Sequence, residues 1–112
     1  MMAIIQLSFT SKMALAIRDG RKLCTTRLEQ KGNPGDEFLA CCCGEPQRII
    51  DVIQLPLWRI ATEMYRLEGF NSPEEFIKTW NTLPGYPEYK YAKYAEFPVH
   101  FFLPAREKHA ID

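Results

Sequence analysis

The stretch that decides the fold is residues 17–27, with the sequence IRDGRKLCTTR. Its first half ends a helix, because Gly20 can take the left-handed conformation that stops a helix after its last turn. Its second half begins a strand whose alternation places Thr25 and Arg27 on one face and Thr26 on the other. We expect Thr26 to serve strand formation only. Cationic and hydroxyl groups gathered where a strand begins predict an anion or nucleotide site.

The segments on either side of this stretch predict a small barrel. Pro56 lies inside the longest strand signal and marks an edge or a bend, as when one strand serves both halves of a barrel. Ser72 is followed by proline and two glutamates, which predicts a helix start. The predicted strands are 3–9, 23–29, 37–43, 48–58 and 99–103. Three helices are predicted: one after a cap at Thr10 or Ser11, one over 60–67, and one after Ser72. This order favours an α+β fold, a mostly antiparallel β-barrel flanked by about three helices.

Length and charge limit the classes of protein that fit. With 112 residues, the chain predicts one domain over residues 1–104 and a polar tail over 105–112. The 14 basic and 14 acidic residues cancel, so bulk charge attracts neither duplex DNA nor a membrane. No stretch approaches the roughly 20 apolar residues of a membrane span, and no signal peptide is expected at the start. A cytoplasmic location is the prediction.

The cysteines favour a reduced protein without a metal. Cys41, Cys42 and Cys43 are consecutive, which excludes an ordinary disulfide framework. The two histidines, His100 and His109, are remote from them in sequence, so we expect small buried side chains and no metal site. No cofactor is expected.

Several motifs occur together in a distinctive order. They are Gly20-Arg21-Lys22 with Thr25 and Arg27, Gly35-Asp36, EGFNSPEEF at 68–76 with Trp80, and the strand near 99–102. This ordered set resembles the ASCH domain of the PUA-like superfamily over nearly the whole chain, although many members have threonine where Leu23 stands. The resemblance implies a cleft beside the first helix that holds RNA or nucleotide-like ligands. One bacterial branch of that family is an amidohydrolase that removes the acetyl group of N4-acetylcytidine.

The catalytic set of that branch falls on Lys22, Thr25 and Glu68. Lys22 could accept a proton or provide a fixed charge for phosphate, or be a solvated lysine. Thr25 is a candidate nucleophile that needs a base, a ligand hydrogen-bonding group, or a strand threonine. Glu68 falls in the last turn of the helix predicted over 60–67, where a carboxylate opposes the helix dipole. It could donate a proton, accept bonds from a base, or pair with Arg66 or Arg59.

Two further groups are candidates for ligand binding. Arg27 and Arg21 could hold a phosphate or carboxylate through the fork of N–H donors on the guanidinium. Arg27 is the better candidate because it shares a face with Thr25. For Arg21, the more common role at such a position is that of a solvated turn residue. Residues 86–94, YPEYKYAKY, interleave aromatic rings with lysines. Rings that stack on bases and lysines that pair with phosphates are typical of single-strand binding, and the alternative is a lid packed on the barrel end. The candidates here are Tyr89, Lys90, Tyr91 and Lys93.

Three functions therefore remain open. The first is an enzyme, a hydrolase in which Lys22 activates Thr25 against an amide of an acylated nucleoside and Glu68 protonates the leaving amine. The second is a non-catalytic module that binds RNA, a nucleotide or a modified nucleoside. The third, a ribonuclease, lacks a clear histidine pair. The oligomeric state stays open.

Overall fold

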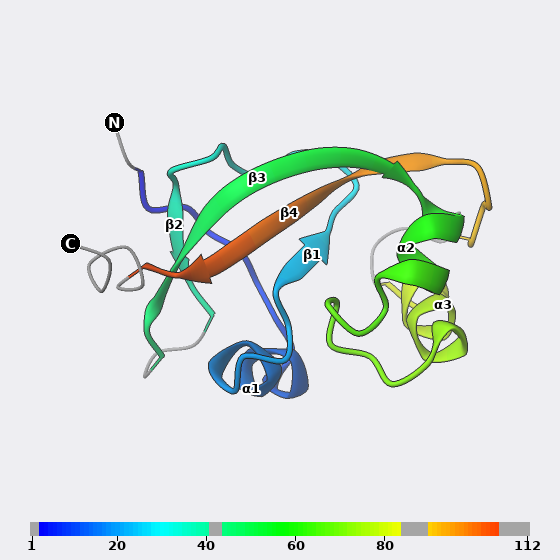
Figure 1. The fold of residues 1–112 in the computed structure, drawn as a ribbon, viewed down its shortest axis with the longest axis horizontal. Coiled ribbons are helices and arrows are strands. Elements are labelled where there is room, and N and C mark those ends of the chain that lie inside the picture. The colour runs from blue at the N-terminus through cyan, green and yellow to red at the C-terminus, as the bar shows by residue number, and fades with distance from the viewer. Residues whose placement is uncertain (1–2, 41–43, 84–89, 106–112) are drawn as a thin grey trace.

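The computed structural model describes residues 3–40, 44–83 and 90–105. Within these ranges a curled antiparallel sheet is accompanied by three helices (Figure 1), which confirms the predicted α+β class with a mostly antiparallel, barrel-like sheet. The strands are β1 (Cys24–Thr26), β2 (Glu37–Leu39), β3 (Pro46–Pro56) and β4 (Glu96–Pro104). The helices are α1 (Ser11–Arg18), α2 (Leu57–Glu63) and α3 (Pro73–Asn81).

The sheet is built around the long antiparallel pair of β3 and β4. The strand order is β1-β4-β3-β2, and every pairing in it is antiparallel. The register between β3 and β4 shifts between Ile49 and Asp51, and such a bulge bends and twists a strand. Both strands consequently arc across the molecule (Figure 1). The curvature makes the sheet a half-barrel, with α1 on its hollow side.

The helices occupy two places relative to this arc. Helix α1 lies beneath the sheet beside β1, whereas α2 and α3 pack together at the far end of β3 (Figure 1). The core is divided accordingly. One cluster joins α2 and α3 to β1 and β4 through residues that include Leu57, Ile60, Trp80 and Val99, and a second lies between α1 and the sheet, around Phe38.

Both predicted helix signals have the expected geometry. Gly20 has φ of 78°, and the backbone N–H groups of Arg21 and Lys22 both donate to the carbonyl of Ala16. The side chain of Ser72 accepts a hydrogen bond from the backbone of Glu75, with proline at the first helical position. Lys22 therefore emerges from α1 in a fixed direction.

Other element boundaries differ from the prediction. Residues 3–9 form no extended strand, and only Ile4 makes a bridge, parallel to Glu37 of β2. Helix α2 begins at Leu57, because Pro56 both closes β3 and stands at the N-cap position. The helix ends at Glu63. Glu68 thus lies in the turns beyond the helix, and the dipole argument made for it was wrong.

Strands β1 and β2 are shorter than predicted, at three residues each, and residues 41–43 of the predicted third strand lie outside the described ranges. Among the described residues, no helix has the length and apolar character needed to cross a membrane.

Candidate functional site

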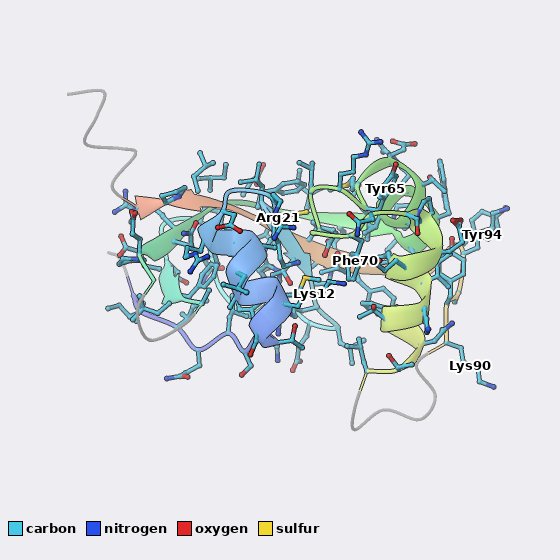
Figure 2. The ribbon with its side chains drawn as sticks, turned by 90° about the horizontal axis from the view of Figure 1, so that it is seen from below. Lys12, Arg21, Tyr65, Phe70, Lys90 and Tyr94 are labelled. Carbon is cyan, nitrogen blue, oxygen red and sulfur yellow. The ribbon has the colours of Figure 1, made fainter. Side chains whose placement is uncertain are left out.

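A cavity of about 480 Å³ opens between α1, β1 and α3. Figure 2 looks onto α1 and shows two of its lining residues, Lys12 on α1 and Phe70 toward α3. The cavity combines apolar walls with buried charges, as ligand sites do. The residues that line it are Ser8, Phe9, Thr10, Lys12, Met13, Lys22, Thr25, Thr26, Arg27, Leu28, Glu29, Lys31, Glu68, Phe70, Phe76, Thr79, Trp80 and Leu83.

Lys22 and Glu68 meet in this cavity, although 46 positions separate them. Each is only 3% exposed. The Lys22 ammonium donates to the backbone carbonyl of Glu68 at 2.8 Å and lies 3.4 Å from the carboxylate oxygen Oε1. Taking two charges out of water is unfavourable unless they are paired and hydrogen-bonded, and this pair meets both conditions.

The second carboxylate oxygen of Glu68 is bound from β1. The hydroxyl of Thr26 donates to Oε2 at 2.6 Å, and the thiol of Cys24 donates to the same oxygen at 3.6 Å. Burial and the nearby Glu68 carboxylate raise the pKa of the Cys24 thiol well above its usual range, so it stays protonated as a donor. Thr26 is thus part of the site, a role that sequence reasoning missed.

The segment that carries Glu68 is fixed against the edge of β1. The carbonyl of Leu67 accepts the backbone N–H of Leu23 at 2.7 Å and that of Cys24 at 3.2 Å. Gly69 follows with φ of 93°, and a Cβ there would approach Cβ of Lys22 at 3.3 Å. Only glycine satisfies both the conformation and the close approach. Glu68 is therefore held in place before any ligand arrives.

Thr25 and Arg27 form a separate arrangement in the same cavity. Arg27 Nε donates to the Thr25 hydroxyl at 3.3 Å, and Nη2 donates to the carbonyl of Ser8 at 2.8 Å. The guanidinium carbon lies 4.8 Å from the centre of the Phe9 ring. Burial lowers the pKa of Arg27, partly offset by the Glu68 charge, but arginine remains a cation at any ordinary pH.

The hydroxyl of Thr25 has no hydrogen bond to Lys22 or Glu68 in the part of the chain that the structure describes. The structure thus brings Lys22, Thr25 and Glu68 to one cavity, but it joins only Lys22 and Glu68 directly.

His100 of β4 supports this arrangement from inside the sheet. Its ring Nε2 accepts the backbone N–H of Lys31 at 2.9 Å, which leaves Nδ1 to donate to the carbonyl of Thr25 at 3.1 Å. Burial lowers its pKa, with a smaller contribution of the same sign from the Arg27 charge. The neutral imidazole therefore ties β1 to the turn that carries Lys31.

The tyrosine and lysine candidates that the structure describes lie outside the cavity lining. The described members, Lys90, Tyr91 and Lys93, do not line the cavity, and Tyr89 lies outside the described ranges. Tyr91 packs against the cluster that joins α2 and α3, and burial raises its pKa. The labels of Lys90 and Tyr94 in Figure 2 lie beyond α3, at the side away from Lys12. Residues 90–94 of this connection therefore lie beside α3 and do not line the cavity.

Arg21 is also outside the cavity. Its guanidinium is exposed and lies 3.6 Å from the carboxylate of Asp19, as expected of a solvated turn residue. Across residues 3–40, 44–83 and 90–105, no three His, Cys, Asp or Glu side chains are grouped closely enough to hold a metal ion.

Comparison with solved structures identifies the class of fold. The ASCH domain of Lactobacillus crispatus superimposes with a TM-score of 0.62 at 11% identity, covering 92% of this chain and 79% of that one. A protein of Enterococcus faecalis described as DUF984 gives 0.61 at 16% identity, covering 96% and 80%. The ASCH protein of Zymomonas mobilis gives 0.55 at 13% identity, covering 89% and 65%. The chain therefore has an ASCH-like, PUA-like fold.

Sequence comparison adds nothing to this likeness. No protein-family model matches the chain, and no curated protein matches it. At 11–16% identity the structural likeness defines the fold alone, so the function has to be argued from the cavity.

Proposed function

We propose that the cavity binds a nucleoside unit, either as a free nucleotide or within single-stranded RNA. Its walls carry aromatic rings, among them Phe9, Phe70 and Trp80, and aromatic side chains are what unstacked bases pack on. The observation that carries the proposal is Glu68, a buried carboxylate inside a cavity large enough for a base.

Glu68 retains capacity for a further donor. A carboxylate offers roughly four lone-pair sites. Lys22, Thr26 and Cys24 occupy three of them. The remaining one suits the exocyclic amino group of a base, and a carboxylate that accepts from cytosine N4 is an established mode of recognition.

Calorimetric titration of cytidine, uridine and short single-stranded RNA tests the proposal. We expect cytidine to bind more tightly than uridine, because only cytosine offers an amino group at position 4. Glu68→Gln should lower the affinity for cytidine about tenfold or more, since a charge-assisted hydrogen bond is lost.

The matched control is Glu63→Gln, because that exposed carboxylate pairs with Arg59 on α2 and does not line the cavity. Failure of all three ligands to bind, or equal affinities of Glu68→Gln and wild type, would overturn the proposal. Circular dichroism establishes beforehand that both variants are folded.

A second candidate function is hydrolysis of an acylated nucleoside amide, and the Lys22–Glu68 pair favours it. If one proton moves from Lys22 to Glu68, the pair becomes a neutral amine and a carboxylic acid. The amine can then take the hydroxyl proton of a threonine as its oxygen attacks the amide carbonyl carbon. The C–N bond breaks as Glu68 protonates the leaving amine, and water later hydrolyses the ester, which restores the threonine hydroxyl.

Thr25 is a better candidate nucleophile than its neighbour Thr26, which also lines the cavity. The Thr26 hydroxyl already donates a hydrogen bond to Glu68, whereas the Thr25 hydroxyl accepts one from Arg27 and can still donate its own proton.

Both ring nitrogens of His100 are bound to backbone groups, so the ribonuclease alternative gains no support from that histidine.

Release of acetate from N4-acetylcytidine decides this second candidate. We expect turnover by the wild type, its loss in Thr25→Val, and partial retention in Thr26→Val. No turnover by the wild type would remove the catalytic role, and full turnover by Thr25→Val would remove the mechanism.

A further inference from the structure

We infer that the ligand carries a phosphate and that Arg27 is its anchor, so that the cavity is built for a nucleotide in preference to a free nucleoside. This inference rests on the proposed function and extends it. It concerns a second charged residue of the cavity lining, which forms no ion pair with Glu68.

The first observation is a charge imbalance that the whole chain does not share. The sequence holds 14 cationic and 14 acidic residues. The described lining of the cavity holds four cations but only two carboxylates, Glu29 and Glu68. Each of these carboxylates already has a lysine partner: Lys31 lies 3.6 Å from Glu29, and Lys22 lies 3.4 Å from Glu68. The excess positive charge therefore belongs to the other two cations, Lys12 and Arg27.

Those two cations differ in their surroundings. Lys12 is exposed and lies 3.5 Å from Glu75, a carboxylate outside the cavity lining. Arg27 is half-buried, and within the described ranges no carboxylate lies within 4.0 Å of its guanidinium. A charge removed from water is unfavourable unless something compensates it. A bound anion would supply that compensation.

The guanidinium is also prepared to bind one. Of its five N–H donors, one is given to Thr25 and one to Ser8. No acceptor among the described residues takes the other three, and the contact with the Phe9 ring orients the guanidinium plane. A planar fork with fixed orientation matches the paired oxygens of a phosphate.

Arg27 and Glu68 lie apart in one cavity, so a single ligand could contact both. Both side chains line the cavity, and because they form no ion pair their charged atoms are more than 4.0 Å apart. A base amino group at Glu68 and a phosphate at Arg27 would need the ribose between them. An internal phosphodiester of RNA and the terminal phosphate of a mononucleotide share this chemistry.

Calorimetric titration of cytidine, 5′-CMP, 3′-CMP and an oligocytidylate tests the inference. We expect at least one phosphorylated ligand to bind about tenfold or more tightly than cytidine, with an affinity that falls as salt increases. Preference for a mononucleotide over the oligonucleotide would identify a terminal phosphate, and the reverse an internal one. Either result supports the anchor.

In Arg27→Gln the phosphorylated ligand should lose its advantage over cytidine, so that the ratio of the two affinities approaches one. Arg27→Lys should retain part of the advantage of the phosphorylated ligand. The lysine variant replaces Arg27→Gln in the experiment if the glutamine variant fails to fold. Arg18→Gln is the matched control, because this exposed arginine of α1 lies outside the cavity lining.

Failure of the inference and failure of the proposed function give different results. Equal affinities for cytidine and all phosphorylated ligands in the wild type would overturn the phosphate anchor and leave nucleoside binding intact. If no nucleoside or nucleotide binds, pyrophosphate titration followed by phosphorus NMR tests the anchor alone. Binding that depends on Arg27 would then support it, and absence of binding would overturn it.

Discussion

Among the described residues two ion pairs are largely withdrawn from solvent, and they are built differently. Arg48 and Glu37 lie opposite each other on β3 and β2, and both Nε and Nη2 of the arginine reach the same carboxylate oxygen, at 3.2 and 2.6 Å. Their side chains are 17% and 13% exposed. The side chains of Lys22 and Glu68 are more deeply buried, with 4% of each exposed. Their charged atoms are nevertheless farther apart, at 3.4 Å.

The difference separates a pair that fixes strands from a pair that serves a site. Register places Arg48 beside Glu37, so their contact stabilises the pairing of β2 with β3. Lys22 gives its shortest hydrogen bond to the backbone carbonyl of Glu68 and a longer one to the carboxylate. The carboxylate therefore lies in the cavity with a lone-pair site that no described residue occupies, and both proposed functions use that site.

The largest effect is expected from breaking the deeper pair. Lys22→Met leaves the Glu68 carboxylate buried without its cation, which should lower the free energy of unfolding by about 3–5 kcal/mol. Urea denaturation followed by tryptophan fluorescence measures this. The double variant Lys22→Met/Glu68→Gln should recover part of the loss. A loss below about 1 kcal/mol in the single variant would show that the pair is not shielded as described.

A smaller effect is expected from the strand pair. Arg48→Met should lower the free energy of unfolding by about 1–2 kcal/mol, because Glu37 is near enough to solvent to be hydrated once its partner is removed. Nucleotide affinity should stay unchanged, since neither residue lines the cavity. The same urea and calorimetric measurements serve here, and a clear loss of affinity would contradict the division of roles.

The smallest effect concerns His100, a buried titratable group without an ion pair in the described ranges. Its folded-state pKa lies below the ordinary value of 6.5, so the unfolded chain takes up the proton first. The stabilising contribution is therefore complete above about pH 6.5 and declines as the pH falls below it, by at most about 1.4 kcal/mol per pH unit.

Arg27 and Lys31 add to this decline, because a protonated imidazole would face both cations, and Glu68 partly opposes them. Urea denaturation between pH 7.5 and 5.5 measures the slope. His100→Gln should flatten it relative to the wild type, whatever its effect on stability at pH 7.5. An unchanged slope would assign the pH dependence to other groups.

Local signals in the sequence predicted much of the fold. The stop at Gly20 and the cap at Ser72 depend on conformational preferences of single residues, and both have the expected geometry. Pro56 was expected to mark an edge or a bend in a strand over 48–58, but it closes β3 and starts α2, so the following helix begins earlier than its apolar spacing indicated. Where a boundary depended on the sheet, as for residues 3–9, alternation alone predicted too much strand.

The site was predicted in part for a similar reason. Alternation along β1 correctly separated Thr25 and Arg27 from Thr26 and Cys24. It could not show which side Glu68 would approach, because the path of an irregular segment depends on tertiary contacts. Glu68 bonds to the side that holds Thr26, while the cavity reaches both sides.

The contact of Leu67 with β1 has a consequence for self-association. β1 and β2 are the outer strands of the sheet, and an outer strand with free backbone groups invites pairing with another chain. Leu67 covers the start of β1, and the bonds of Ala3 and Ile5 to Glu37 cover β2 in the same way. The segment that positions the candidate catalytic carboxylate therefore also covers backbone groups at the edge of the sheet. Shortening this segment would leave those groups free to pair with another chain, and would also displace Glu68 from the site.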